Sequence, residues 1–263
     1  MTRFVRCVVD GEPAYGVIEG AEVALIEPHP FTTYRSTGRR LPVEGLRLLA
    51  PVIPSKIVAV GRNYVDHAAE LGNGVPTEPL LFLKPSTAVI GPGDPIRLPT
   101  DLSDEVSHEG EIAVVIGALV SRVTPEVAAK AILGVTCAND VTMRDVQRRE
   151  EQWARSKGFD GSCPLGPAIA TGLDLSDIRV RTFVDGELRQ DGHSSQMVFD
   201  VPSIIAEISR SMTLLPGDVV LTGSPAGVAT LRPGERVRVE IDGVGALENP
   251  VVDREAEDGG GRR

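Results

Sequence analysis

The sequence is poor in aromatic residues, which make up only 4% of its 263 residues. Proteins that bind single-stranded nucleic acid stack the bases on aromatic side chains, so this class is disfavoured. The net charge of −10 agrees, because a phosphate backbone attracts basic surfaces. We therefore expect no nucleic-acid partner, and an anionic substrate would need local cations from a metal ion or from individual Arg and Lys side chains.

Cysteine is also scarce, with Cys7, Cys137 and Cys163 alone and no CxxC motif. An odd count without that motif argues against a disulfide framework and against a cysteine-based zinc site. The sequence has no run of about 20 apolar residues that could span a membrane, and its first residues lack the apolar core of a signal peptide. We expect a cytoplasmic protein with no membrane partner.

The pattern of strands and turns predicts three parts. Residues 1–50 alternate short apolar strands with turns and form a small β-rich N-terminal unit. Residues 51–252 form the main, catalytic domain, in which short buried strands alternate with short helices. Residues 253–263 are rich in charge and glycine and are expected to be a disordered tail.

Two glutamates stand at the start of an apolar run. Glu109 and Glu111 precede the β-branched residues 114–116, which predict a buried strand. Side chains alternate across a strand, so both carboxylates point to one face. Two like charges that lose water so close together need a positive group between them. A bound cation is the functional interpretation; Arg or Lys partners, or exposure at the strand end, are the alternatives.

Asp140 ends the apolar stretch 135–138 and is a candidate third carboxylate. The helix that follows has a potential N-cap of its own in Thr142, with Asp145 three residues later, close to a capping box. A cap at Thr142 would leave the side chain of Asp140 free for a site. Asp140 acting as the cap itself is the alternative.

His67 and Glu70 lie three residues apart on a short predicted helix over 65–72, so they share a face. A carboxylate beside an imidazole fixes its tautomer and raises its basicity, as a general base requires. An exposed surface pair is the alternative. Lys84 follows a predicted strand over 80–83 and either faces a site or is a solvated lysine at a strand end.

Five motifs together resemble the fumarylacetoacetate hydrolase family: Gly61-Arg62-Asn63-Tyr64 with Asp66-His67, Phe82-Leu83-Lys84-Pro85, Glu109-x-Glu111 before Val-Val-Ile-Gly, Asn139-Asp140-x-Thr142-x-Arg144-Asp145-x-Gln147, and Thr222-Gly223-Ser224-Pro225-x-Gly227-Val228. Their order and spacing over about 54–250 make the assignment specific. The resemblance is to small members: acylpyruvate hydrolases, oxaloacetate decarboxylases and 2-hydroxyhepta-2,4-diene-1,7-dioate isomerases of aromatic catabolism.

The resemblance implies an α+β fold, a mixed β-sheet roll of barrel-like form flanked by short helices. It also implies a homodimer and a divalent cation, Mg²⁺ or Mn²⁺, on Glu109, Glu111 and Asp140, in keeping with the preference of hard cations for oxygen ligands. The implied catalytic residues are His67, Glu70 and Lys157. The implied substrate-binding residues are Arg62, Arg144, Gln147, Thr222 and Gly223.

The function that the resemblance implies is hydrolysis of a C–C bond in an acylpyruvate-type 2-oxo acid, such as fumarylpyruvate. The metal would stabilise an enolate, and His67 with Glu70 would activate water. Decarboxylation or isomerisation of a 2-oxo dicarboxylate uses the same metal site and is the alternative. A non-enzymatic β-rich module that binds a metal is the competing class.

Overall fold

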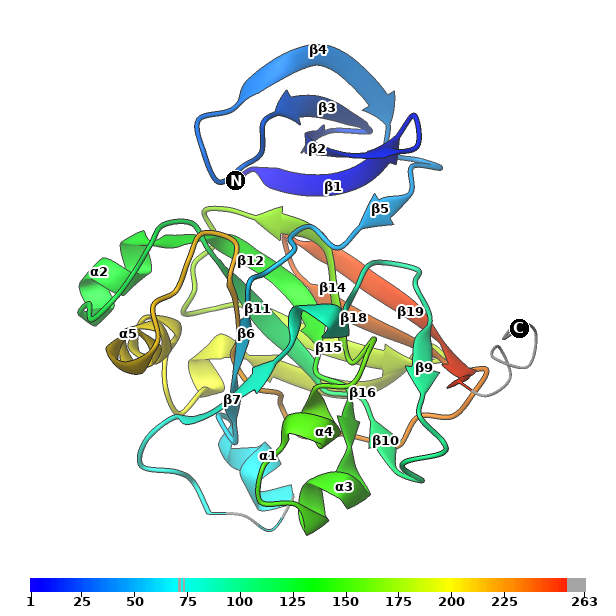
Figure 1. Cartoon of the computed structure of the whole chain (residues 1–263), viewed down its shortest axis with the longest axis vertical. Coiled ribbons are helices and arrows are strands. Elements are labelled where there is room, and N and C mark those ends of the chain that lie inside the picture. Colours follow the sequence, from blue (N-terminus) through cyan, green and yellow to red (C-terminus); the bar gives the residue numbers. More distant parts are fainter. Residues whose placement is uncertain (71, 73, 255–263) are drawn as a thin grey trace, which may run out of the picture.

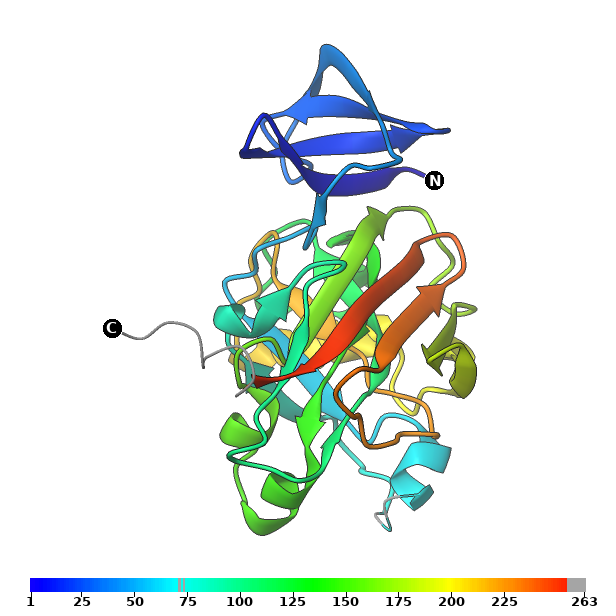
Figure 2. The same ribbon diagram turned by 90° about the vertical axis from the view of Figure 1, so that its right-hand side faces the viewer.

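The computed structural model describes residues 1–70, 72 and 74–254 (Figure 1). Its N-terminal part is a set of antiparallel strands joined by tight turns. Asp10 and Gly11 both have positive φ, 54° and 87°, the backbone that a two-residue hairpin turn requires. The four strands form a lobe that projects from the rest of the molecule in both views (Figures 1 and 2): β1 (Arg3–Val9), β2 (Glu12–Glu19), β3 (Glu22–Glu27) and β4 (Arg35–Pro42).

This lobe is continuous with the main sheet, because β1 pairs antiparallel with β14, with Phe4 opposite Ile169. The strand order of the sheet is β4-β3-β2-β1-β14-β12-β11-β17-β6-β7. The strands of its main part are β14 (Cys163–Ala170), β12 (Ile132–Asn139), β11 (Gly110–Ile116), β17 (Val219–Leu221), β6 (Ile57–Gly61) and β7 (Leu80–Lys84), while the short β5 (Leu48–Leu49) and β8 (Val89–Ile90) pair with β1 and β14.

A second sheet of order β16-β15-β18-β19-β9 packs beside the first. Its strands are β16 (Glu187–His193), β15 (Arg179–Val184), β18 (Arg236–Ile241), β19 (Gly245–Asp253) and β9 (Ile96–Leu98), and β10 (Val106–Ser107) pairs separately with β13 (Thr142–Met143). Of the predicted tail 253–263, Asp253 ends β19, and residues 255–263 lie outside the described residues.

Helices are short and flank the sheets: α1 (Val65–Glu70), α2 (Pro125–Lys130), α3 (Arg144–Arg149), α4 (Ala154–Lys157), α5 (Val201–Ser211), with 3-10 turns η1 (Ser86–Ala88) and η2 (Ser194–Gln196). The side chain of Asp200 caps α5 by accepting the N–H of Ser203 at 2.8 Å. None of the helices in the described ranges has the length and apolar character needed to cross a bilayer. The predicted α+β fold class, including the small β-rich N-terminal unit, is confirmed.

The central strand β11 is buried along its whole length, as predicted. Ile112 and Val114 join one apolar core, which also contains Ile204 of α5. Ala113 and Val115 join a second core on the opposite face. The two glutamates share the parity of Ala113 and Val115, so the alternation along the strand places both carboxylates on that second face, at the point where the strand begins.

Candidate active site

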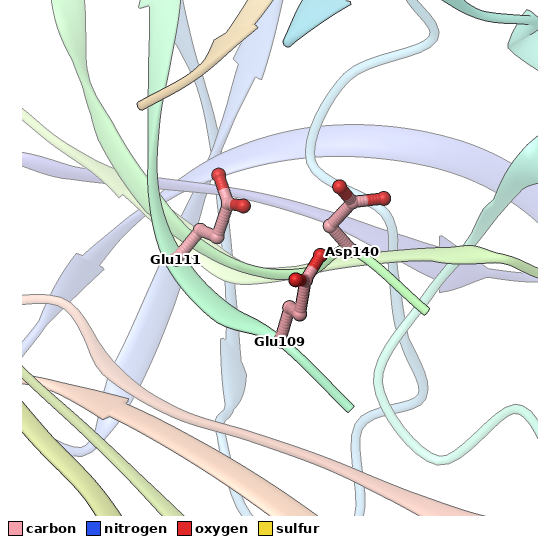
Figure 3. Close-up of side chains that lie close together, drawn as sticks. All are labelled: Glu109, Glu111 and Asp140. Carbon is pink, nitrogen blue, oxygen red and sulfur yellow. The ribbon is translucent and has the colours of Figure 1, made fainter. Parts of the chain in front are cut away.

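The start of β11 and the end of β12 bring three carboxylates together. These strands pair antiparallel, with Gly110 opposite Asn139, so Glu109 and Glu111 lie beside Asp140. One oxygen of each carboxylate lies within 4.8 Å of the others, and all three residues are buried. Figure 3 shows the three side chains gathered at this edge of the sheet. The sequence-predicted ligand set is therefore assembled in one place.

Basic side chains contact two of these carboxylates. Lys157 Nζ lies 2.6 Å from Asp140 Oδ2 and also bonds Glu109 Oε2. Lys84 Nζ lies 2.6 Å from Asp140 Oδ1, and Arg144 Nη2 lies 2.6 Å from Glu109 Oε1. Lys84 is only 1% exposed, so the solvated-lysine alternative for it is wrong. Arg and Lys partners, one of the predicted alternatives, are therefore present for Glu109, whereas no salt bridge reaches Glu111 among the described residues.

Glu111 is the carboxylate that these cations compensate least. Burial raises its pKa, and the nearby Asp140 and Glu109 raise it further, well above the usual range. Burial also acts to raise the pKa of Glu109, but Arg144 and Lys157 outweigh it and hold that pKa well below the usual range. A hydrogen bond from the Gly223 N–H, at 2.8 Å, orients the Glu111 carboxylate.

The donor chemistry of this cluster fits a hard divalent cation. Its ligand atoms are all carboxylate oxygens, which Mg²⁺ and Mn²⁺ prefer to the nitrogen and sulfur ligands typical of zinc. The raised pKa of Glu111 shows that the buried negative charge is undercompensated there. A cation bound by Glu109, Glu111 and Asp140 would offset this charge.

His67 is buried at the edge of the same cluster. Its Nδ1 lies 3.2 Å from Glu70 Oε2, and its Nε2 lies 3.2 Å from Glu109 Oε1. The imidazole is only 4% exposed, so the alternative of an exposed surface pair is wrong for His67. The backbone N–H of Gly227 donates to both oxygens of Glu70, at 3.1 and 3.2 Å, and ties α1 to the loop after β17.

A cavity of about 840 Å³ opens over the cluster. Arg62, Arg144 and Gln147 line it, as do the catalytic candidates His67 and Lys157. Arg144 Nη1 donates to Gln147 Oε1 at 3.0 Å, so these two predicted substrate contacts form a unit. The backbone φ of Arg62 is 59°, an uncommon conformation for a residue other than glycine and one that clusters at functional sites.

Two predicted substrate contacts lie behind the cavity wall. The hydroxyl of Thr222 is buried and donates to the carbonyl oxygen of Ile112 at 2.9 Å. Gly223 contacts the site through the N–H that it donates to Glu111. Their direct contact with substrate stays a prediction, whereas their neighbour Ser224 lines the cavity.

The prediction that Thr142 caps the following helix is wrong. Helix α3 begins at Arg144 with Met143 at the cap position and no side-chain cap. Thr142 instead lies in β13 and pairs with Ser107 of β10, which turns the Thr142 hydroxyl inward. That hydroxyl lies 2.8 Å from the Asp140 carbonyl oxygen and 3.1 Å from Glu109 Oε2. Asp140 is nevertheless free of capping, since its carboxylate bonds Lys84 and Lys157.

The sequence patterns missed two residues that shape the site. Trp153 lies in the charged stretch 148–155, which has no apolar periodicity, yet its ring packs edge-to-face on Phe82 at 5.4 Å and both line the cavity. Gln190 is buried in β16 behind the cluster and bonds Ser224 Oγ at 2.7 Å. Trp153 could have been noticed because it is the single tryptophan of the chain. Gln190 is an isolated glutamine in a hairpin, and no sequence pattern marks it.

Comparisons with known proteins identify the family of this chain. Residues 56–252 match the family model described as fumarylacetoacetate (FAA) hydrolase C-terminal, and residues 2–51 match one described as Rv2993c-like, N-terminal. Protein Rv2993c of Mycobacterium tuberculosis is 49% identical over 230 residues, 86% of each chain. The mitochondrial oxaloacetate tautomerase fahd2 of Xenopus laevis is 44% identical over 220 residues, 79% of this chain and 69% of that protein.

The crystal structure of a 2-hydroxyhepta-2,4-diene-1,7-dioate isomerase from Mycobacterium marinum superposes with a TM-score of 0.90 at 43% sequence identity. The match covers 97% of this chain and 99% of that one, so the N-terminal lobe is included. A family match over three quarters of the chain, joined to these identities, shows that the chain belongs to the fumarylacetoacetate hydrolase family of enzymes.

Proposed function

We propose that this enzyme moves a proton at the carbon beside the ketone of a 2-oxo dicarboxylate, as a keto–enol tautomerase or double-bond isomerase. The observation that carries the proposal is the buried imidazole of His67, held between Glu70 and Glu109 at the cavity wall. Relatives named oxaloacetate tautomerase and hydroxyheptadienedioate isomerase support this reaction class.

His67 would carry the proton on Nε2. With Nδ1 donating to Glu70, Nε2 would be the nitrogen that takes up the substrate's proton, and Glu109 Oε1, 3.2 Å away, would accept the Nε2–H that forms. Both ring nitrogens face carboxylates, so the ring is also stabilised after it has taken up a proton. A base that holds a proton and returns it to another carbon of the substrate is what isomerisation requires.

The negative charge of the substrate would be met by the cations of the site. When bound at Glu109, Glu111 and Asp140, a divalent cation supplies Lewis acidity toward the ketone oxygen. Lys157 and the Arg144–Gln147 unit add positive charge and hydrogen-bond donors beside it. These groups are preorganised, since Lys157 is 3% and Arg144 is 7% exposed.

A second carboxylate on the substrate would meet Arg62. Arg62 lines the cavity and forms no salt bridge with a carboxylate among the described residues. Phe82 and Trp153 add an apolar surface to the cavity lining. A cavity that offers both cationic groups and an apolar surface suits a dicarboxylic acid whose ends are separated by a carbon chain.

Hydrolysis of an acylpyruvate is the second candidate function. A cavity of about 840 Å³ is far larger than a four-carbon acid needs, so it has room for an acyl group and an attacking water. The same His67 and Glu70 could deprotonate that water. Decarboxylation shares the enolate step and is a further outcome of the test. The homodimer implied by the resemblance and the cytoplasmic location expected from the composition stay predictions.

The experiment is a panel of 2-oxo acids incubated with the purified chain and Mg²⁺ or Mn²⁺. Enol loss from oxaloacetate and cleavage of acylpyruvates are followed by ultraviolet absorbance, CO₂ release is measured directly, and deuterium uptake beside the ketone is followed by NMR. We expect rapid tautomerisation and deuterium uptake that fall at least 100-fold in His67→Gln.

Dependence on His67 separates the two candidates. Cleavage of acylpyruvates that depends on His67, without enol loss or deuterium uptake from the dicarboxylates, would replace the tautomerase with the hydrolase. An active His67→Gln variant would remove the proposed proton carrier in either case. Glu248→Gln, on the exposed face of β19, is the matched control and should keep wild-type rates.

A further inference from the structure

Gln190 connects two parts of the active site from behind. It lies in β16, is 1% exposed, and uses both ends of its amide. Its Oε1 accepts the N–H of Gly110 and lies 3.0 Å from both that nitrogen and His108 Nδ1. Its Nε2 donates to Ser224 Oγ and to the carbonyl oxygen of Pro225, each at 2.7 Å. A backbone N–H on one side and a carbonyl on the other fix the orientation of the amide.

One end of this amide holds the strand that carries the acidic cluster. Gly110 lies between Glu109 and Glu111, so the Gly110 N–H fixes the backbone from which both carboxylates project. A Cβ at Gly110 would lie 1.9 Å from Thr182 Oγ1, which shows how closely β15 backs this point. Since the amide oxygen of Gln190 can only accept hydrogen bonds, His108 Nδ1, 3.0 Å away, donates to it.

The other end holds the loop after β17, residues 222–228. Two backbone amides of this loop orient the reacting groups: Gly223 N–H donates to Glu111, and Gly227 N–H donates to Glu70, the partner of His67. At Gly227 the φ is +102°, and a Cβ there would lie 2.0 Å from the Arg189 carbonyl oxygen. The loop therefore rests directly against the strand that carries Gln190.

We propose that Gln190 is a positioning residue that sets the placement of the His67–Glu70 pair relative to the acidic cluster. It touches neither group. It acts through the Gly110 N–H on the carboxylate side and through Ser224 and Pro225 on the loop that presents Gly227 to Glu70. This inference rests on the proposed function in one respect, namely that the His67–Glu70 pair and the acidic cluster act on the same substrate.

The test compares Gln190→Leu with Gln196→Leu, a matched control at an exposed position of a 3-10 turn, where the side chain accepts the His193 N–H. For Gln190→Leu we expect kcat to fall about 100-fold with KM changed less than threefold, since small misplacements of reacting groups affect the transition state most. Titration of the metal-free protein with Mg²⁺ should show about 10-fold weaker binding. The control should match the wild type in both.

A double-mutant cycle with Glu70→Ala distinguishes positioning from general loosening. If Gln190 acts through Glu70, Gln190→Leu should lower kcat much less in the Glu70→Ala background than in the wild type. Equal losses in both backgrounds would overturn the proposal, as would kcat and Mg²⁺ binding within twofold of wild type. If Gln190→Leu does not fold, Gln190→Glu replaces it; it keeps the accepting oxygen and removes the amide donor to Pro225.

Mg²⁺ binding keeps this test independent of the proposed reaction. If the wild type lacks tautomerase activity, the kcat comparison uses whichever reaction of the panel it does catalyse, and the binding comparison needs no substrate. Weaker Mg²⁺ binding in Gln190→Leu would then support the positioning role while the proposed function fails. Unchanged binding would overturn the positioning role.

Discussion

Glu111→Gln should separate the stability of this enzyme from its metal binding. Gln keeps the volume of Glu and can still accept the Gly223 N–H, but it removes one of three buried carboxylates. The pKa of Glu111 is raised well above its usual range. The folded metal-free protein therefore binds a proton there that the unfolded chain releases, and its stability falls as the pH rises through that interval. The variant should lose this decline and be the more stable protein at high pH.

Mg²⁺ should reverse that order. At a free concentration 100 times the Kd, binding to the folded wild type adds about 2.7 kcal/mol. For a chain of this length such an increment corresponds to a Tm increase of about 5–10 °C. Glu111→Gln lacks one of three charged ligands and should gain little, so the two proteins should exchange rank when Mg²⁺ replaces a chelator.

The assay is thermal unfolding with chelator and with excess Mg²⁺, at several pH values. Glu248→Gln on the exposed part of β19 serves as the charge-matched control and should follow the wild type in both conditions. An equal Mg²⁺-dependent increase of Tm in Glu111→Gln and the wild type would refute the assignment of Glu111 as a ligand. If Glu111→Gln had a lower Tm than the wild type at every pH in the presence of chelator, the argument from charge repulsion would be refuted.

Two further predictions concern Arg62 and His108. Arg62→Gly should raise the free energy of unfolding by about 1 kcal/mol, because glycine adopts the observed φ of 59° without strain. The same variant should lower kcat/KM at least 10-fold for a 2-oxo dicarboxylate but not for a 2-oxo monocarboxylate. An equal change of kcat/KM for both acids would contradict the role assigned to Arg62. Burial lowers the pKa of His108 from about 6.5 in the unfolded chain to about 4 in the folded protein. The neutral ring therefore stabilises the fold above pH 6.5. This contribution, up to about 3 kcal/mol, is lost as the pH falls toward 4. Urea unfolding of His108→Asn should lack that part of the decline, and parallel pH profiles for the two proteins would show that His108 is not buried as a neutral ring.

Local patterns were sufficient to predict the buried strand at whose start Glu109 and Glu111 lie. Alternation alone predicts that Glu109 and Glu111 share a face, and the β-branched run predicts their burial. The burial of His67 and Lys84 was not decidable, because the same residues at the ends of short elements fit a solvated surface equally well. Their burial depends on α4 and on the loop after β17, which lie far away in the sequence.

Other features were beyond sequence patterns for the same physical reason. Thr142 has the spacing of a helix cap, but pairing with Ser107 turns its hydroxyl toward Glu109 and Asp140. Gln190 reaches Gly110 across 80 residues and Ser224 across 34 residues. Such contacts depend on which strands become neighbours, and hydrophobic periodicity does not encode the neighbour of a strand.

Among the described residues, one part of the cavity wall has no hydrogen bond to the acidic cluster, and this has an evolutionary consequence. Residues 148–153 line the cavity without a hydrogen bond to the acidic cluster within the described ranges, and Arg148 and Arg149 pair with Glu105 and Asp145 instead. Substitutions or length changes in this segment can change the shape of the cavity while β11 and the strands packed behind it stay intact. Lineages that share this fold can thus diverge in substrate choice through one surface segment and inherit the chemistry unchanged.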